Sequence, residues 1–304
     1  MSNYGKFADF CRDTGNQWST LPVCYLFNQA STRDNIGYVG GCELTGIPLG
    51  GERYLRNLGS ILLCAIAILA SAFLLWKTER KKAAVGRREM QLFLIGFIIV
   101  SICEIFTIGG FPLNSAVRRA FVAVHLASIV ATAWILMLNG LVGYQLLDDG
   151  TPVSIGLILA SAAAFFIGVG YIALDTGFRW TGFWDSSLDL PNQDYALYTL
   201  YLLAPLVFIV VFFLLEAFLV LRILGERKPM LYLVAAALLF AIAQIFQWVV
   251  SVHICNGTTG KINGGLFQTL FTLLSVVMIW VFWSSITEDD WPMPAVGSGV
   301  GGYS

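Results

Sequence analysis

Charged residues are scarce in this sequence. Only 12% of its 304 residues are Asp, Glu, Lys or Arg, and 57% are hydrophobic, whereas an ordinary soluble domain carries roughly 25% charged residues. A soluble chain of this length cannot bury so much apolar surface, so we expect a lipid bilayer to act as part of its solvent. The net charge of −1 gives no electrostatic reason to expect a nucleic-acid partner.

The motifs of common enzymes and cofactor sites are also missing. The sequence has no glycine-rich phosphate loop, no serine nucleophile elbow and no CxxC pair. It contains two histidines, which excludes a three-histidine zinc site and argues against the seven-helix zinc hydrolases of membranes. A retinal-binding opsin needs a lysine in its last helix, and residues 265–286 contain none. We therefore expect a protein that is not an enzyme and that holds no cofactor or metal ion.

A secretory signal peptide is not expected, because residues 1–57 are of mixed polarity and lack a continuous apolar stretch. Seven later segments approach the roughly 20 apolar residues that cross a bilayer. They are residues 58–76, 91–109, 121–146, 153–174, 196–221, 231–254 and 265–286. The sequence thus predicts an all-α membrane protein, with a seven-transmembrane-helix bundle at 58–286 between an N-terminal segment, 1–57, and a tail, 287–304. No internal repeat is visible, which argues against an inverted-repeat transporter.

Lysine and arginine in the short connections predict the orientation of the bundle. Two connections on the same side are rich in these residues: Lys77, Arg80, Lys81, Lys82, Arg87, Arg88, Arg222, Arg227 and Lys228. The opposite connections carry fewer, and the positive-inside rule places the richer side in the cytosol. We therefore expect the N-terminal segment in the lumen and the C-terminal tail in the cytosol.

The cysteines fit this orientation. Four of the six fall on the predicted lumenal side: Cys11, Cys24, Cys42 and Cys255. Because the lumen is oxidising, we expect these four to form two disulfides, for which three connectivities are possible. A bond at Cys255 would tie the N-terminal segment to the bundle, whereas four free thiols are the alternative.

Several polar side chains lie within the predicted spans, where each is costly and therefore a functional candidate: Glu104, His125, Glu216, Gln244, Gln247 and His253. Glu216 is close enough to the cytosolic end of its span to snorkel. One hypothesis joins Glu104, His125 and His253 in a metal or proton-transfer cluster. The other, which we favour, has these three residues satisfy one another, with Arg118 or Arg119, and so fix the packing of the helices.

Small residues recur at every fourth position of the span 153–174: Gly156, Ala160, Ala164 and Gly168. Such a stripe lets two helix backbones approach closely. We expect it to form a helix contact inside the bundle, and the alternative is a docking face for another membrane protein.

The last connection and the tail contain two further motifs. Asn256-Gly257-Thr258 is the single N-glycosylation sequence, but its connection is short, so we expect Asn256 to lie against the membrane and stay unmodified. Glu288, Asp289 and Asp290 follow the last span, where acidic residues oppose the helix macrodipole. They are either a solvated helix end or a di-acidic export signal of the kind that cargo adaptors of vesicle coats read.

Two stretches of unusual sequence are NYGKFADFCRDT (3–14) and HICNGTTGKINGGLFQTLFTLLSVVMIWVFWSSITEDDW (253–291). Both closely resemble the fungal chitin synthase export chaperone family, and the resemblance extends over essentially the whole chain, including the seven-helix layout. Residues 15–35 are less typical of the family than the sequence around them.

The resemblance implies a multi-pass protein of the endoplasmic reticulum membrane that helps its client, chitin synthase, to fold and leave that compartment, thereby supporting cell-wall biogenesis. It implies that the protein stays there or accompanies its client to the plasma membrane, and it brings no catalytic residues with it. A seven-helix receptor is the main alternative, consistent with the lumenal N-terminus and disulfides. An intramembrane enzyme or transporter is the other, and it requires Glu104, His125 and His253 to converge.

Overall fold

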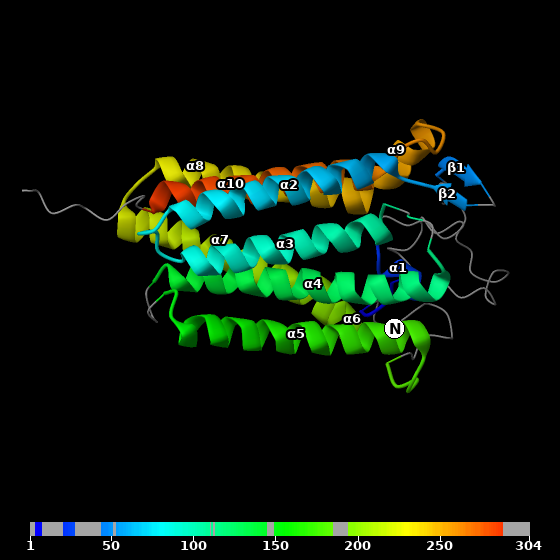
Figure 1. The fold of residues 1–304 in the computed structure, drawn as a ribbon, viewed down its shortest axis with the longest axis horizontal. Coiled ribbons are helices and arrows are strands. Elements are labelled where there is room, and N and C mark those ends of the chain that lie inside the picture. Colours follow the sequence, from blue (N-terminus) through cyan, green and yellow to red (C-terminus); the bar gives the residue numbers. More distant parts are fainter. Residues whose placement is uncertain are drawn as a thin grey trace, which may run out of the picture.

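In a computed structural model of the chain, residues 4–7, 21–27, 44–50, 53–109, 111, 113–144, 149–184 and 194–287 are described. Within these residues, seven helices are long and apolar enough to cross a membrane. They are α2 (Leu58–Arg80), α3 (Arg87–Thr107), α4 (Ser115–Val142), α5 (Pro152–Phe178), the continuous helix Tyr195–Leu224, the continuous helix Lys228–Gly257 and α10 (Gly264–Ile286). All seven run lengthwise through one elongated bundle (Figure 1), as the sequence predicts.

Two of these helices contain π-helical segments. The Tyr195–Leu224 helix consists of α6 (Tyr195–Leu197), η2 (Tyr198–Leu203), α7 (Ala204–Phe218) and η3 (Leu219–Leu224). The Lys228–Gly257 helix consists of α8 (Lys228–Ile245), η4 (Phe246–Val250) and α9 (Ser251–Gly257). A π-turn widens the helix and redirects its carbonyl groups, and it is found often at functional sites.

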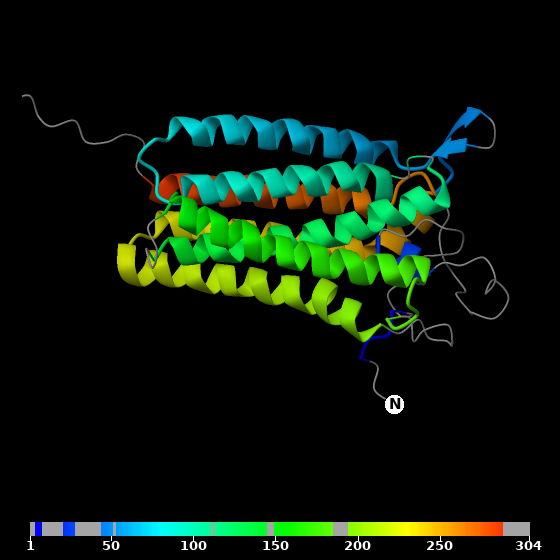
Figure 2. The ribbon, with the colours of Figure 1, turned by 60° about the horizontal axis from the view of Figure 1, so that its bottom comes forward.

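The most buried span is α4, which packs against α3, α5 and α7. On the other side of the bundle α10 packs against both α8 and α2. Among the seven spans, α5 packs chiefly against α4 and therefore lies at the periphery. Figure 2 shows α2 (blue to cyan) along one edge and the Tyr195–Leu224 helix (yellow-green) along the opposite edge.

Polar side chains cap the helices and make them longer than their apolar segments. The Asn57 side chain accepts the Ser60 N–H at the start of α2 (3.2 Å) and donates to Asn263 Oδ1 at the start of α10 (3.0 Å). Asn114 begins α4 six residues before the predicted start at 121, by accepting the Ala116 N–H (3.3 Å). The predicted span does not include this first part of α4, because two arginines there interrupt the apolar segment.

Those two arginines are held by the chain itself. Arg119 Nη1 donates to the carbonyl oxygen of Gly177 at the end of α5 (2.8 Å). The Arg118 guanidinium lies 5.8 Å from the ring centre of Tyr25. Both contacts are with elements at one end of the bundle, so a charged first turn is compatible with an otherwise apolar helix.

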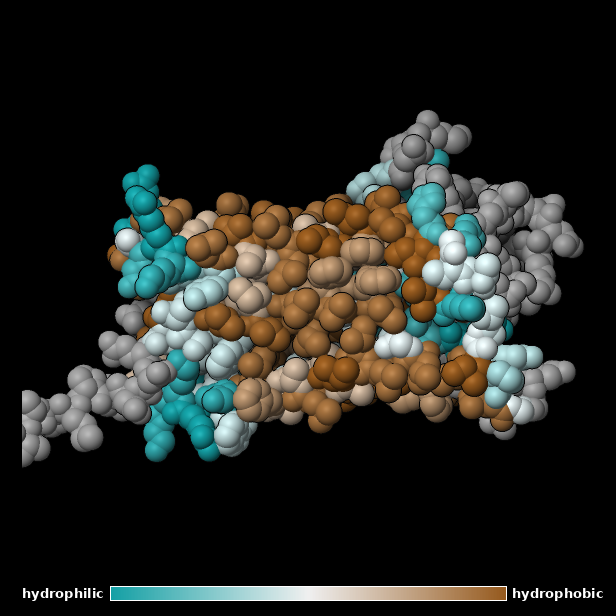
Figure 3. Space-filling view, turned by 90° about the horizontal axis from the view of Figure 1, so that it is seen from above, coloured by the Kyte–Doolittle hydropathy of each residue, from teal (hydrophilic) through white to brown (hydrophobic). Residues whose placement is uncertain are grey.

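The two ends of the bundle differ in composition. At one end lie α1 (Cys24–Phe27), α9 and the hairpin of β1 (Ile47–Gly50) and β2 (Arg53–Leu55), all visible in Figure 1. We call it the cysteine end, since Cys24 and Cys255 lie there. At the opposite end are the α2–α3 and η3–α8 connections, which we call the basic end. Between them the surface is a broad apolar band (Figure 3), the distribution that a bilayer requires.

The N-terminal segment completes the core at the cysteine end. Phe7 and Val23 are fully buried there, in a cluster with Leu126 of α4 and Val169 of α5. The backbone also joins this segment to the bundle, because the Thr45 N–H donates to the carbonyl oxygen of Gly260 (2.9 Å). A separate apolar cluster fills the space between the spans in the basic half.

The last two spans approach closely at Gly264. A Cβ added at Gly264 would lie 2.8 Å from Ser251 Cα and still closer to the carbonyl oxygen of Phe246. We expect Gly264→Ala to lower the free energy of unfolding by about 1–3 kcal/mol, the usual cost of overpacking. Gly156→Ala is the matched control, because its added Cβ meets no atom within 4 Å. Thermal unfolding of the detergent-purified proteins tests this, and equal midpoints would contradict the close packing.

Candidate functional site

Glu104 joins the second span to the last. Its side chain is 5% exposed, and its Oε1 accepts a hydrogen bond from the Thr269 hydroxyl of α10 at 2.5 Å. A buried carboxyl without such a donor is costly. This hydrogen bond therefore fixes the position of α3 relative to α10 at Glu104 and Thr269.

His125 and His253 lie apart from this pair. His125 is 2% exposed, and its Nδ1 lies 2.9 Å from the Thr107 hydroxyl at the end of α3. The side chain of His253 is exposed on α9. The expectation that Glu104, His125 and His253 satisfy one another is thus wrong, because Glu104 and His125 pair with threonines on neighbouring helices and His253 is exposed.

The structure also does not support a metal site formed by Glu104, His125 and His253. Among the described residues no three His, Cys, Asp or Glu side chains are grouped so that they could hold a metal ion. The convergence that the intramembrane-enzyme alternative requires is therefore not observed at Glu104, His125 and His253.

Glu216 is buried and does not snorkel. It is 6% exposed on α7. Its carboxyl faces Gly140 of α4: a Cβ added to that glycine would lie 3.8 Å from Glu216 Oε1. Its Oε2 is buried and, within the described part of the chain, has no hydrogen-bond partner. An acceptor is thus left unpaired at the α4–α7 contact, which is uncommon in a native interior. Nδ2 of Asn139 on α4 is also buried without a partner among the described residues, but its side chain lies near Gly86 at the start of α3.

The last turn of α7, just before η3, has a polar partner in the residue that follows α4 and its C-cap. The Tyr144 hydroxyl donates to the carbonyl oxygen of Leu215 at 2.6 Å. The same carbonyl oxygen also accepts the Leu219 N–H at the start of η3. The hydrogen bond of Tyr144 therefore ties the chain just after α4 to the last turn of α7.

The two glutamines of the sixth span lie at η4. Trp248 Nε1 donates to Gln244 Oε1 (3.1 Å) on the same helix, and Gln247 is half-buried. On the neighbouring α10, Gln268 Oε1 and Thr272 Oγ1 are buried without a partner among the described residues. Polar groups of the last two spans are thus incompletely satisfied.

Glu89 is a buried carboxyl that the sequence analysis missed. It lies in the first turn of α3, is fully buried, and accepts the Gly150 N–H (3.0 Å) and the Ser154 hydroxyl (3.3 Å). Nearby, Asp149 Oδ2 accepts the Gly86 N–H (2.9 Å). The apolar segment predicts a span that begins at 91, which places Glu89 in the polar connection before it. Its position at a helix N-terminus, which favours an acidic residue, was the available signal.

The small-residue stripe of α5 faces outward. Gly156, Ala160, Ala164 and Gly168 are all exposed, and a Cβ on Gly156 or Gly168 meets no atom within 4 Å. The expected contact inside the bundle is therefore wrong. The face of α5 that packs on the bundle carries other residues, Ser154, Ile158, Ala162 and Val169, so the stripe remains available to lipid or to another protein.

The remaining candidates lie at the two ends. Cys24 and Cys255 are both disulfide-bonded, whereas Cys64 and Cys103 are free and buried. Asn256 is exposed in the last turn of α9. The other candidates, Cys11, Cys42, Glu288, Asp289 and Asp290, lie outside the described residues.

Comparison with known proteins gives a consistent result. The sequence model of a family described as chitin synthase export chaperone matches residues 3–297. Curated proteins with this description are similar over most of their length. One from Coccidioides immitis (strain RS) is 27% identical over 289 residues, which cover 95% of this chain and 84% of that protein.

Two further relatives show the same extent of similarity. The protein from Chaetomium globosum is 29% identical over 290 residues, 94% of this chain and 83% of its own. The protein from Cryptococcus neoformans var. neoformans serotype D is 30% identical over 288 residues, 94% of this chain and 75% of its own. No solved structure matches this chain significantly.

The Glu104–Thr269 hydrogen bond can be tested by a double-mutant cycle. Thr269→Val keeps the shape of the side chain but leaves the Glu104 carboxyl unpaired, which should cost about 1–2 kcal/mol of stability. Adding Glu104→Leu removes the carboxyl as well, and we expect most of that loss to be recovered. The measurement is thermal unfolding of the four purified proteins. Additive effects of the two substitutions would mean that the two side chains do not interact.

Proposed function

This chain belongs to the chitin synthase export chaperone family, and on that basis we propose that it is a non-enzymatic membrane chaperone for chitin synthase. In this role it assists the folding of chitin synthase and its export from the endoplasmic reticulum, and so supports cell-wall chitin synthesis. The observation that carries the proposal is the family match over residues 3–297. A seven-helix receptor, in contrast, would reach the cell surface and bind its ligand without chitin synthase.

We propose that the bundle 58–286 spans the endoplasmic reticulum membrane with its basic end in the cytosol. Two independent features support this orientation. Lysine and arginine accumulate in the α2–α3 and η3–α8 connections, and the disulfide-bonded Cys24 and Cys255 lie at the opposite end, where an oxidising lumen permits such bonds. The N-terminal segment 1–57 is then lumenal and the tail 287–304 cytosolic.

The outward stripe of α5 is the surface we propose for the client. Lipid tails are as apolar as leucine, so helices associate in a membrane through close packing of small residues and through hydrogen bonds. Glu104 and Glu216 are buried and cannot reach a client directly, whereas the stripe at Gly156, Ala160, Ala164 and Gly168 is open. A transmembrane helix of chitin synthase can approach α5 closely along it.

Filling this stripe should weaken client binding without unfolding the chaperone. Replacing Gly156, Ala160, Ala164 and Gly168 by leucine should reduce co-purification of chitin synthase from solubilised membranes by about tenfold, the equivalent of about 1.4 kcal/mol. The thermal unfolding midpoint should not fall, since all four residues are exposed and a Cβ on Gly156 or Gly168 meets no atom within 4 Å.

A matched control places leucine at exposed alanines of other spans, Ala65 and Ala72 of α2 and Ala241 of α8. These substitutions should leave co-purification unchanged. Equal recovery of chitin synthase with the stripe variant would remove α5 from the interface, and equal loss with the control variant would show that bulk alone, and not the stripe, matters.

The acidic residues of the tail are the proposed link to export. The end of α10 is fixed at the basic end, because Trp283 Nε1 donates to the carbonyl oxygen of Val85 (3.0 Å) and Trp280 Nε1 to the Thr78 hydroxyl (2.8 Å). The chain therefore leaves the bundle on the side that we propose to be cytosolic. There a cargo adaptor of a vesicle coat can bind Glu288, Asp289 and Asp290.

Alanine at Glu288, Asp289 and Asp290 tests this link. We expect chitin synthase to accumulate in the endoplasmic reticulum, with surface delivery reduced several-fold, while its co-purification with the chaperone is retained. The measurement is the distribution of fluorescent chitin synthase in living cells. Alanine at Met293, Val296 and Val300 of the same tail is the control. Normal delivery by the acidic-residue variant would refute the signal.

A further inference from the structure

We propose that the basic end is a binding surface for the headgroups of anionic phospholipids. The proposal goes beyond chaperone function and rests on the transmembrane placement proposed above. It is carried by lysines and arginines of two separate connections that have no carboxylate partner within the described residues. Six exposed side chains make up this set, the unpaired cations: Lys77, Arg80, Lys82, Arg222, Arg227 and Lys228.

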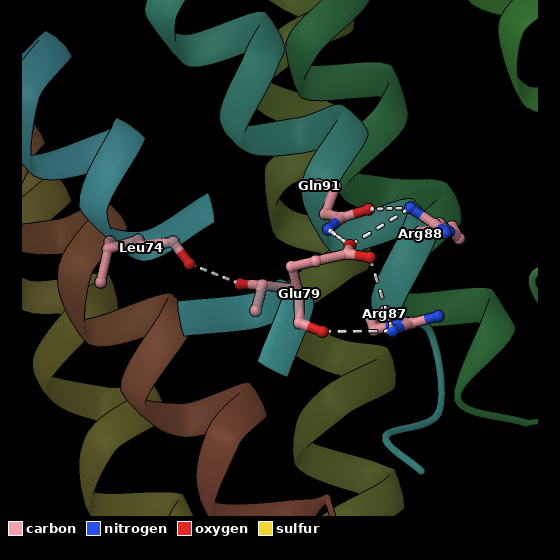
Figure 4. A network of polar contacts seen from close by, with 6 residues as sticks. Leu74, Glu79, Arg87, Arg88 and Gln91 are labelled. Carbon is pink, nitrogen blue, oxygen red and sulfur yellow. Dashed lines mark hydrogen bonds and ion pairs between the residues drawn. The ribbon is translucent and has the colours of Figure 1, made fainter. Parts of the chain in front are cut away.

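The neighbouring arginines show what pairing looks like at this end. Glu79 Oε2 accepts from Arg88 Nη1 (3.3 Å) and from Gln91 Nε2 (2.6 Å), and Arg87 Nη1 lies 3.9 Å from Glu79 Oε1 (Figure 4). Glu79 is thus shared between two arginines and is not available to the unpaired cations. Glu226, the exposed acid of the η3–α8 connection, forms no ion pair with a described residue.

At the end of α2 the unpaired cations lie over aromatic rings. The Arg80 guanidinium is 3.7 Å from the ring centre of Trp76, and Lys77 Nζ is 5.9 Å from it. Trp76 is 49% exposed. An exposed tryptophan with cations beside it is typical of the boundary between hydrocarbon and headgroups. The ring marks the depth of the bilayer surface, and the cations reach the phosphate level.

The second group surrounds the turn between η3 and α8. Gly225, at φ 68°, ends η3 in the left-handed conformation and reverses the chain, so Arg222 of the last η3 turn and Arg227 and Lys228 of the first α8 turn are a few residues apart. Ile223, 59% exposed, and Leu231, 71% exposed, flank them. Cations above exposed aliphatic side chains again indicate the headgroup level.

The backbone at this turn also favours an anion. Arg227 occupies the N-cap of α8 without a side-chain hydrogen bond to the helix, and the first turn contains no acidic residue. Its first N–H groups therefore keep their partial positive charge. A cation at a helix N-terminus is unfavourable unless an anion from outside the chain compensates it. A phosphate provides that charge and accepts the hydrogen bonds.

The spacing of the two groups favours a lipid surface over an acidic peptide. α10 packs between α2 and α8, so the groups lie on different sides of the bundle, with hydrophilic residues at both borders of the basic end in Figure 3. A bilayer leaflet surrounds the bundle and contacts both groups at one depth, whereas a single extended peptide engages one of them.

The test uses the full chain, purified in detergent doped with phosphatidylserine or with phosphatidylcholine, and counts retained lipids by native mass spectrometry. We expect phosphatidylserine to be retained preferentially. Replacing Arg222, Arg227 and Lys228 by glutamine, or Lys77, Arg80 and Lys82 by glutamine, should lower its retention by about fivefold for each cation removed. The double variant Arg87→Gln with Arg88→Gln is the control, because both arginines already form ion pairs with Glu79.

Three results would overturn the proposal: equal retention of the two lipids, a control that loses as much phosphatidylserine as the target variants, or full displacement of the lipid by a soluble acidic peptide, which would favour a protein partner. Thermal unfolding checks that each variant is folded. The lipid assay contains no chitin synthase, so a negative result in it does not bear on the proposed chaperone function. Extraction of the native membranes with carbonate tests the transmembrane placement separately, since a protein that is released refutes it.

Discussion

A helix bundle with an apolar outer band must satisfy every backbone N–H and C=O from within the chain, and the rest of this structure depends on that constraint. Regular helices meet it along most of each span. In the last turn of α7, before η3, the carbonyl oxygen of Leu215 accepts a further hydrogen bond from the Tyr144 hydroxyl. At the helix starts, the side chains of Asn57, Asn114 and Thr151 accept the first free N–H groups. Polar side chains thus serve several of the places where the regular helix ends.

The same constraint separates two kinds of surface. The buried carboxyls of Glu89 and Glu104 accept hydrogen bonds from Ser154 of α5 and Thr269 of α10 and so stabilise particular helix pairs. The outer face of α5, in contrast, carries small residues, so a partner helix would bind it by close packing and not by hydrogen bonds. A client helix that packs on small residues gains dispersion energy without requiring a specific polar sequence.

The sequence predicted the seven spans because apolar segments of sufficient length are a direct consequence of the bilayer thickness. It misplaced the start of α4, since a charged first turn can be stabilised by contacts with Gly177 and Tyr25, which are far away in the sequence. It also misassigned the partners of Glu104 and His125. Their threonines lie on other faces of other helices, and helix rotation cannot be read from composition in spans that are apolar on all sides.

The α5 stripe shows the limit of a local pattern. Spacing alone identifies four small residues on one face, but it does not say whether that face points inward, because inward and outward faces are equally apolar in a membrane protein. Only the tertiary contacts of α5 with α4 decide this. The position of Glu89 in a helix, conversely, can be predicted, because an acidic residue is favourable in the first turn of a helix. A predicted start at 91 leaves that first turn outside the span.

The hydrogen bond between Asn57 and Asn263 has a consequence for biosynthesis. It joins the caps of the first and last spans across 206 positions of the chain, and Glu104 likewise obtains its donor from the last span. While the ribosome is still producing the sixth span, neither side chain has this partner. Both hydrogen bonds form only when the seventh span is in place, so the last part of the bundle to be synthesised completes the polar contacts of the first two spans.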